Sequence, residues 1–414
     1  MTKAESLRPA AASDKSARQT SRLGLTSPLP VSWSQVAAFR LSRHHLLERA
    51  PARSLISVVR NMAGAQAQVL SAAQISLWSR LSDLKVANIQ AALGARTLAR
   101  ATCMRGTLYL LPSRDLALFV RGSAGRFERE IRWMRGKGFS DRDIDRLTEA
   151  VLGALDSPLT RRELAERVSR ALGVRMGAAQ GAGWGNRTPV PAVPMGGLMF
   201  PVVYLLHVAA ARGVVCSGPS RANEPTFVRA DAWIPRWGDM PREQAEGKLL
   251  RRYLRAFGPA TPSDFALWAG MPLRDARQIW AREEKDFSPV SVQGWAAAVL
   301  REDVQELAQA GFERPSVRLL PYFDTYLLSH VNREHLVARQ DHQRVYRAQG
   351  WIAPVVLVDG RAVATWAHAW EGSRLRVKVT RFAAISRRVT AGLREEAHDL
   401  GRFLGSSNVD VQID

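Results

Sequence analysis

Gln66 and Gln68 are the residues of this sequence whose type and spacing most readily do chemistry. They are two neutral amides separated by one alanine, and the apolar run that follows them, residues 70–81, is typical of a helix. An amide carries donors and an acceptor, so two amides held close together can orient a water molecule or hydrogen-bond the edge of a base. The same residues also fit a polar helix start whose amides cap backbone groups or face solvent, and spacing alone leaves both interpretations open.

The charge of the chain points to a polyanionic partner. The 414 residues include 59 Lys and Arg against 38 Asp and Glu, a formal net charge of +21, and only seven of the basic residues are lysine. The planar guanidinium fork of arginine fits phosphate groups and guanine edges. An excess of this size raises the local concentration of a polyanion and speeds encounter. The composition therefore favours nucleic acid over an anionic membrane as the partner.

Several classes of site and location are disfavoured by the residue types. The two cysteines, Cys103 and Cys216, do not have a C-x-x-C spacing, so neither a disulfide framework nor a cysteine zinc site is expected. The histidines lack the carboxylate company of a metal-binding helix. No apolar run reaches the roughly 18 residues of a membrane span, and the N-terminus lacks the apolar core of a signal peptide. We therefore expect a soluble cytoplasmic protein with no metal and no other cofactor.

One order of elements recurs three times, namely helices followed by two strands joined by a turn, which is the order of a winged helix. Capping-box patterns at Ser32 with Gln35 and at Thr160 with Glu163 mark helix starts in the first two copies. In the third copy a tight turn at Gly270 separates two short helices, as in a helix-turn-helix that enters a DNA groove. Three unrelated helical hairpins would give a similar pattern, and that alternative stays open.

The predicted helices are residues 32–48, 69–81, 85–93, 160–172, 198–212, 242–257, 263–269, 273–283 and 390–404. The predicted strands are residues 98–104, 106–112, 214–217, 225–231, 317–321 and 374–379, with hairpins at 288–300 and 353–366. Asp359 and Gly360 form the turn of the second hairpin. These elements predict a mainly helical α+β fold.

The domain organisation that we expect is three tandem winged helices followed by a β-rich, small barrel-like domain. Its parts are a disordered tail (1–30), a first winged helix with the two glutamines (31–120), a second winged helix (121–238) with a mobile Gly- and Pro-rich loop (175–201), a third winged helix (239–314) and a C-terminal β-rich domain with a terminal helix (315–414).

Four stretches besides the Q-x-Q motif carry a resemblance to a known family. They are residues 104–112, 258–268, 319–328 and 356–366. With this order of elements, the chain resembles the AlkZ/YcaQ-like bacterial alkylpurine DNA glycosylases over roughly residues 31–405. One departure is Tyr109, where the family often has histidine.

The resemblance implies a DNA glycosylase that excises N7-alkylated purines and, as in some members, unhooks interstrand crosslinks. It implies a partner that is double-stranded DNA carrying alkylated purines, and we expect a monomer. Members with Q-x-Q include self-resistance enzymes of organisms that produce DNA-alkylating antibiotics.

The site residues that we expect fall into two groups. Gln66 and Gln68 are the catalytic residues and position the attacking water. The expected DNA-binding residues are arginines and two wing residues: Arg40, Arg43, Arg105, Thr107, Tyr109 and Arg361. No lysine lies near the motif to form a Schiff base, so a monofunctional enzyme without lyase activity is expected.

A non-catalytic DNA-binding protein, such as a transcription regulator, is the alternative. Winged helices and a large positive charge serve that function equally well. A regulator prefers a defined sequence, whereas a repair enzyme binds with little sequence preference.

Overall fold

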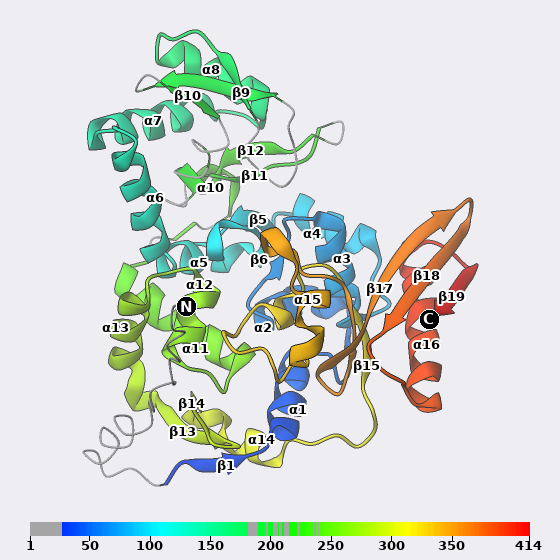
Figure 1. Ribbon diagram of the computed structural model, residues 1–414. Helices are drawn as coiled ribbons and strands as arrows, with labels where there is room; N and C mark the ends of the chain where they lie inside the picture. Colours follow the sequence, from blue (N-terminus) through cyan, green and yellow to red (C-terminus); the bar gives the residue numbers. More distant parts are fainter. Residues whose placement is uncertain are drawn as a thin grey trace, which may run out of the picture.

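The computed structural model describes residues 27–180, 189–195, 198–201, 206, 209–210, 215–221, 224–235, 237–238 and 240–414. Within these ranges the chain is a mixed α+β fold with several small sheets and one five-stranded sheet near the C-terminus (Figure 1). No helix in these ranges is long and apolar enough to cross a membrane. Most of the expected N-terminal tail, up to residue 26, lies outside the described residues.

The two glutamines belong to a small sheet in the first part of the chain. The short strand β3 (Ala65–Gln66) pairs antiparallel with β6 (Leu108–Pro112), which pairs in turn with β5 (Leu98–Thr102). The predicted strand pair at β5 and β6 is confirmed. β3 is not predicted from the sequence, because two residues carry no alternation of apolar and polar side chains.

The first part of the chain contains four helices, of which three are predicted from the sequence. They are α1 (Trp33–Arg43), α2 (Leu55–Asn61), α3 (Leu70–Trp78) and α4 (Val86–Gly94), and α2 is the one without a prediction. The capping box of α1 is confirmed, since Ser32 Oγ accepts the Gln35 N–H at 3.2 Å and Gln35 Oε1 accepts the Ser32 N–H at 2.9 Å. α1 ends well before residue 48, because the chain turns at His45 with φ 55°. A further short pair, β2 (Ala50–Pro51) and β4 (Leu81–Ser82), is parallel.

The next region contains a run of helices and a second small sheet. Its helices are α5 (Leu116–Gly122), α6 (Gly125–Gly136), α7 (Asp141–Ala154), α8 (Arg161–Ala171) and α10 (Ala230–Trp233). The strands β7 (Leu159–Thr160), β11 (Val215–Ser217) and β12 (Thr226–Arg229) form the sheet, in the order β11-β12-β7. The capping box of α8 is confirmed, with Glu163 Oε2 accepting the Thr160 N–H at 2.8 Å.

The prediction of a mobile loop at residues 175–201 is wrong for the part of this segment that the structure describes. Three strands form an antiparallel sheet there: β8 (Gly177–Gln180), β9 (Pro189–Met195) and β10 (Leu198–Pro201). The helix expected from residue 198 therefore does not begin there. Prolines are tolerated in the middle strand because β9 pairs with β8 through one half and with β10 through the other, so most of its residues need one ladder partner only. Residues 181–188 and 196–197 lie outside the described residues.

The third region follows its prediction most closely. α11 (Arg242–Phe257), α12 (Pro262–Ala269) and α13 (Leu273–Glu283) are confirmed, and so is the hairpin of β13 (Phe287–Val292) and β14 (Trp295–Leu300). Gly270 ends α12 in the left-handed conformation, with φ 77°. β1 (Leu29–Val31) adds in parallel to β13, so the last residues of the expected tail form a strand.

The C-terminal region forms an open sheet. Its order is β15 (Val317–Leu320), β16 (Val355–Val358), β17 (Arg361–Glu371), β18 (Arg374–Arg381) and β19 (Val409–Ile413). The barrel-like closure that we expect is not observed, since β15 and β19 lie at opposite edges of this sheet. The terminal helix α16 (Arg387–Leu404) is confirmed, and it contacts both edge strands. Two short helices, α14 (Val304–Gln309) and α15 (His342–Val345), occupy the connections.

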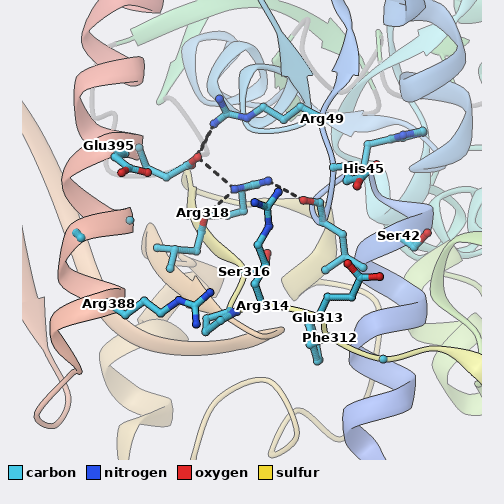
Figure 2. Close-up of a pocket in the computed structure, with 18 of the residues that line it drawn as sticks. Ser42, His45, Arg49, Phe312, Glu313, Arg314, Ser316, Arg318, Arg388 and Glu395 are labelled. Atoms are coloured by element: carbon cyan, nitrogen blue, oxygen red, sulfur yellow. Dashed lines mark hydrogen bonds and ion pairs between the residues drawn. The ribbon is translucent and has the colours of Figure 1, made fainter.

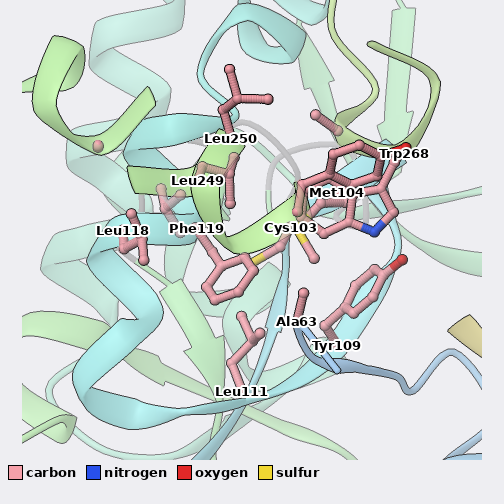
Figure 3. Close-up of a cluster of buried hydrophobic side chains, with 14 of the residues drawn as sticks. Ala63, Cys103, Met104, Tyr109, Leu111, Leu118, Phe119, Leu249, Leu250 and Trp268 are labelled. Carbon is pink, nitrogen blue, oxygen red and sulfur yellow. The ribbon is translucent and has the colours of Figure 1, made fainter. Parts of the chain in front are cut away.

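Two apolar cores join regions that are distant in the sequence. Val58 and Leu77 belong to one core with Leu319 and Leu400. The other core combines residues next to the glutamines with helices of the third region: Ala63, Tyr109, Leu111, Phe119, Leu249 and Trp268 (Figure 3). These cores span the boundaries expected at residues 120 and 314. The sheet that carries the glutamines is therefore held from both sides by later parts of the chain.

A fully buried ion pair fixes the C-terminal region against α3. Arg80 donates through Nη1 and Nη2 to the two carboxylate oxygens of Asp324 at 2.8 and 2.7 Å, and neither side chain is exposed. Ser76 Oγ also donates to Asp324, at 2.7 Å. Burial alone would raise the pKa of Asp324, but the guanidinium and these hydrogen bonds hold it below its usual value.

We predict that Asp324→Ala lowers the free energy of unfolding by about 3 to 5 kcal/mol, because it leaves the Arg80 charge buried without a partner. Urea unfolding at neutral pH measures this change. Since the pKa of Asp324 is lowered, the pair stabilises the fold above the pKa of an unfolded aspartate, and this contribution disappears as the pH falls through the lowered value. Glu166→Ala removes the exposed partner of Arg162 and is the control, with little change expected. Equal effects of the two variants would contradict the prediction.

Candidate active site at the two glutamines

Gln66 lies on the same face of its sheet as Tyr109. The two residues are direct partners in the β3–β6 pairing, and paired residues of an antiparallel ladder project from one face. Gln66 is only 7% exposed, and its side-chain Oε1 is buried with no hydrogen-bond partner among the described residues. A buried acceptor without a donor is costly and uncommon in folded proteins. This oxygen is therefore a candidate for contact with a ligand.

Gln68 is exposed, and a backbone hydrogen bond orients its side chain. Its Oε1 accepts the Leu108 N–H at 3.3 Å. Because an N–H group can only donate, this bond identifies the oxygen end of the amide and leaves the NH₂ group of Gln68 available as a donor. The motif therefore presents an unpaired acceptor on Gln66 and a free donor on Gln68.

The alanine between the glutamines is held at both of its backbone polar groups. Its N–H donates to Leu108 O at 2.6 Å. Its carbonyl accepts from Arg100 Nε at 3.2 Å and from Arg100 Nη2 at 2.9 Å. Arg100 lies on β5 and reaches across the middle strand β6 to make these bonds. Sequence reasoning misses Arg100, because its target is a main-chain carbonyl that no residue pattern identifies.

Gly64 allows β3 to approach β6. Its φ is +93°, and a Cβ built on it would lie 2.6 Å from Leu111 Cδ2 and 3.2 Å from Tyr109 Cδ1. A side chain at this position would thus meet both a strained backbone and an occupied core. Tyr109 and Leu111 belong to the apolar core that such a side chain would enter (Figure 3).

The turn between β5 and β6 holds Arg105 in place. Arg105 has φ 54° and Gly106 has φ 74°. Arg105 Nη2 donates to the hydroxyl of Tyr109, and Nη1 donates to Trp268 O at 3.5 Å. Gly270 also lies against this turn, since a Cβ there would come within 2.8 Å of the Arg105 backbone. Trp268 and Gly270 of the third region therefore contact Arg105 and help to hold it in place.

The DNA contact expected for Tyr109 is not supported. Its side chain has 0% exposure, and burial raises the pKa of its phenol above the usual value. Its role in the structure is to hold Arg105. Thr107 is half-buried, and its hydroxyl donates to Met104 O at 3.2 Å within the turn.

Arg40, another arginine expected to bind DNA, is engaged inside the protein. Arg40 is 2% exposed and donates to Gly258 O at 3.3 Å, to Pro259 O at 2.7 Å and to His335 Nε2 at 2.8 Å. Its guanidinium is therefore out of reach of a phosphate, and it anchors α1 to the start of the third region. Burial, followed by the charge of Arg40, lowers the pKa of His335 to about 2, so this ring is a neutral acceptor.

Arg43 and Arg361 differ in their surroundings. Arg43 Nη2 forms ion pairs with Asp303 at 2.6 Å and with Glu306 at 2.5 Å, so its charge is compensated. Arg361 is exposed at the start of β17 and has no ion pair within the described ranges. Arg361 thus remains a candidate for DNA contact.

Arg333 is a candidate that the sequence does not reveal. Its Nε donates to His330 O at 3.0 Å, and its guanidinium lies over the ring of Tyr346 at 4.5 Å. Burial lowers the pKa of Arg333, and the nearby charge of Arg105 lowers it further, although Tyr346 opposes this. Within the described parts of the chain neither Arg105 nor Arg333 is paired with a carboxylate. Two uncompensated cations of this kind can bind an anion.

A large cavity lies away from the two glutamines. It has a volume of about 1070 Å³ and lies between the end of α1, the segment before β15 and α16 (Figure 2). Arg49 and Arg318 project into it, and both are paired with Glu396. Neither glutamine lines this cavity, so the candidate site is a strand edge and its turn, not this cavity. Among the described residues no group of His, Cys, Asp and Glu side chains is arranged to hold a metal ion.

The fold and the site define a class of protein. Residues 59–403 match the family model for AlkZ-like DNA glycosylases, and the chain belongs to that family. It is 33% identical, over 93% of its length and 100% of the relative, to an interstrand DNA cross-link repair glycosylase of Streptomyces sahachiroi.

The fold is also similar to a solved structure. The Streptomyces sahachiroi DNA glycosylase AlkZ superposes with a TM-score of 0.78 at 30% sequence identity, covering 93% of this chain and 100% of that one. The family resemblance expected from the sequence is thereby confirmed.

We predict that Gly64→Ala lowers the free energy of unfolding by about 1 to 3 kcal/mol, because alanine is strained at φ +93° and its Cβ overlaps Leu111. Thermal or urea unfolding measures the change. Gly94→Ala is the matched control, since a Cβ at that position meets nothing within 4 Å. If Gly64→Ala were as stable as the parent, the close approach of β3 to β6 would be wrong.

Proposed function

We propose that this chain is a monofunctional DNA glycosylase that excises cationic N7-alkylated purines from double-stranded DNA. The observation that carries the proposal is the buried, unpaired Oε1 of Gln66 beside the oriented amide of Gln68. Family membership supports the reaction class. The substrate and the roles of these residues are the steps that we add.

Two neutral amides suit a substrate that already carries a positive charge. Cleavage of a glycosidic bond develops an oxocarbenium-like sugar, and an ordinary purine must be protonated before it leaves. An N7-alkylated guanine departs as a neutral base without an acid. The enzyme then needs mainly a positioned water molecule and electrostatic support at the sugar. Glutamine is a poor base, but it can position water.

The orientation of the amides suggests how the water is held. The free Oε1 of Gln66 accepts a hydrogen bond from the water, and the NH₂ group of Gln68 donates one to it. The second lone pair of the water oxygen then faces the sugar carbon. The residues that contact the motif, Arg100, Leu108 and Tyr109, include no lysine, which supports hydrolysis without Schiff-base formation.

Three arginines are the DNA contacts that we propose. Arg105 and Arg333 carry charges that no carboxylate compensates within the described residues, and Arg361 is exposed on β17. Bonds from such groups to phosphates would fix the register of the duplex without reading its sequence. The repeated helices and hairpins fit three tandem winged helices, and apolar cores cross the limits expected at residues 120 and 314.

A bulky substrate is compatible with the position of the motif. Gln68 is exposed between β3 and α3, so a large adduct need not enter a closed pocket. The similar Streptomyces sahachiroi protein is named as an interstrand DNA cross-link repair glycosylase. We therefore include bulky N7 adducts and crosslinks among the substrates, with self-resistance to an alkylating natural product as the biological setting.

A non-catalytic DNA-binding protein is the second candidate, and the net charge of +21 favours it equally. The two functions differ in a simple assay. A regulator binds one sequence much more tightly than others, whereas the proposed enzyme binds duplexes of any sequence with a steep dependence on salt.

We predict that Gln66→Ala and Gln68→Ala each lower the single-turnover excision rate on an N7-methylguanine duplex by about 10-fold or more. Each variant removes one contact to the attacking water, so DNA affinity should change little. Counting abasic sites gives the rate, and a binding titration gives the affinity. Gln90→Ala, an exposed glutamine on α4, is the matched control. Parental excision by the double variant would rule out the assigned role.

We predict that hypoxanthine and uracil, which are neutral, are not released, while methyl and bulky N7-guanine adducts are. Excision should vary little between about pH 6 and 9, because amides do not titrate and the pKa of Tyr109, the ionisable group on the face of Gln66, is raised above its usual value. Rate measurements on matched duplexes across this pH range test both points. Efficient release of hypoxanthine, or a rate that follows one titrating group, would show that an acid or base acts.

A further inference from the structure

The hydrogen bonds around Ala67 depart from a regular β-ladder. Ala67 lies opposite Leu108, one step beyond the paired residues Gln66 and Tyr109. In a regular antiparallel pair the two residues would exchange both of their backbone bonds. Here the Ala67 N–H donates to Leu108 O, but the Leu108 N–H donates to the side chain of Gln68 instead of the Ala67 carbonyl.

The Ala67 carbonyl that is displaced from the ladder is bound by Arg100. Arg100 donates to it from Nε at 3.2 Å and from Nη2 at 2.9 Å. Arg100 is half-buried and has no ion pair among the residues that the structure describes. Its guanidinium therefore compensates for the ladder bond that Gln68 occupies.

We infer that Arg100 is a positioning residue that keeps the side chain of Gln68 in its working orientation by occupying the Ala67 carbonyl. This inference rests on the proposed function, in which Gln68 holds the attacking water. Arg100 touches neither the water nor the DNA in this role. It acts by binding the Ala67 carbonyl, which leaves the Leu108 N–H free to bond the Gln68 side chain.

Removal of Arg100 would let the Leu108 N–H return from the Gln68 side chain to the Ala67 carbonyl. A buried carbonyl without a donor is unfavourable, and the nearest backbone donor is the Leu108 N–H, which lies opposite in the ladder. If the Leu108 N–H donates to the Ala67 carbonyl, the β3–β6 ladder gains this backbone hydrogen bond. Gln68 then loses the bond that orients its amide. Gln68 would then sample several rotamers at the surface, and the water would lose one of its two contacts.

An arginine suits this position better than a lysine. The two donors of the fork converge on one oxygen, whereas an ammonium group would give a single point contact at the end of a flexible stem. Among the described residues Arg100 also has no carboxylate partner that would compete with the carbonyl. Burial lowers the pKa of Arg100, and the charge of Arg161 lowers it further.

The test is a double-mutant cycle between Arg100 and Gln68. Arg100→Ala should lower the single-turnover excision rate by about 10-fold or more, as Gln68→Ala does. The double variant should be no slower than the slower single variant, because both changes remove the same oriented amide. Affinity for the lesion duplex should stay within about 2-fold of the parent at each salt concentration.

Two further variants separate positioning from a general loss of structure. Arg100→Lys should keep part of the rate, and free guanidinium ion in the assay should raise the rate of Arg100→Ala but not that of Gln68→Ala. Arg96→Ala, which removes another half-buried arginine that donates to a backbone carbonyl, Trp233 O, is the control and should excise at the parental rate. Unfolding curves for every variant show which ones are folded, and Arg100→Lys carries the cycle if Arg100→Ala does not fold.

Three outcomes would overturn the inference. They are parental excision by Arg100→Ala, rate losses of the two single variants that multiply in the double variant, and a weakened, salt-dependent affinity that marks Arg100 as a phosphate contact. Parental excision by Gln68→Ala would instead contradict the proposed function, so the two failures are distinguishable.

Discussion

The pairing of β3 with β6 is the constraint on which the candidate site depends. It is a very short contact, since β3 consists of Ala65 and Gln66 alone. Yet it decides that Gln66 faces Tyr109 and that Ala67 meets Leu108. Two residues of ladder cannot stabilise themselves. The pairing persists because the core around Leu111 and Trp268 lies on one side of the sheet and the core around Leu110 lies on the other.

The positive charge of the chain serves two distinct purposes. Part of it is used inside the fold, as in Arg80 with Asp324, Arg43 with Asp303, and Arg40 with backbone carbonyls. Another part has no carboxylate partner among the described residues, as in Arg105 and Arg333. Unpaired cations repel one another and lower the stability of a free protein. Their repulsion is relieved when a phosphate backbone comes near, so this arrangement favours DNA binding at the cost of some stability.

The sequence predicts regular elements well and their pairing less well. α11 and α13 are correct because their apolar residues recur with the period of a helix, and α12 is correct because a Thr-Pro start and a glycine stop mark its ends. The strands β8, β9 and β10 are missed because glycine and proline indicate a loop, whereas their stability comes from cross-strand partners that local patterns do not contain. Likewise, net charge indicates the partner but does not identify the arginines that face it. Arg40 is buried, and Arg333 is recognised only from its contacts.

The neutrality of the motif explains why its geometry must be held so firmly. A carboxylate at the site could attract and partly deprotonate a water molecule even when misplaced, because its charge acts over distance. An amide acts only through directed hydrogen bonds, which weaken steeply when the angle is poor. In the mechanism that we propose, catalysis by two glutamines therefore depends on orientation more than catalysis by a base would. The bonds of Leu108 to Gln68 and of Arg100 to Ala67 would supply that orientation. A site without an acid or a base would also leave undamaged purines intact in this mechanism, since a neutral purine cannot leave until it is protonated.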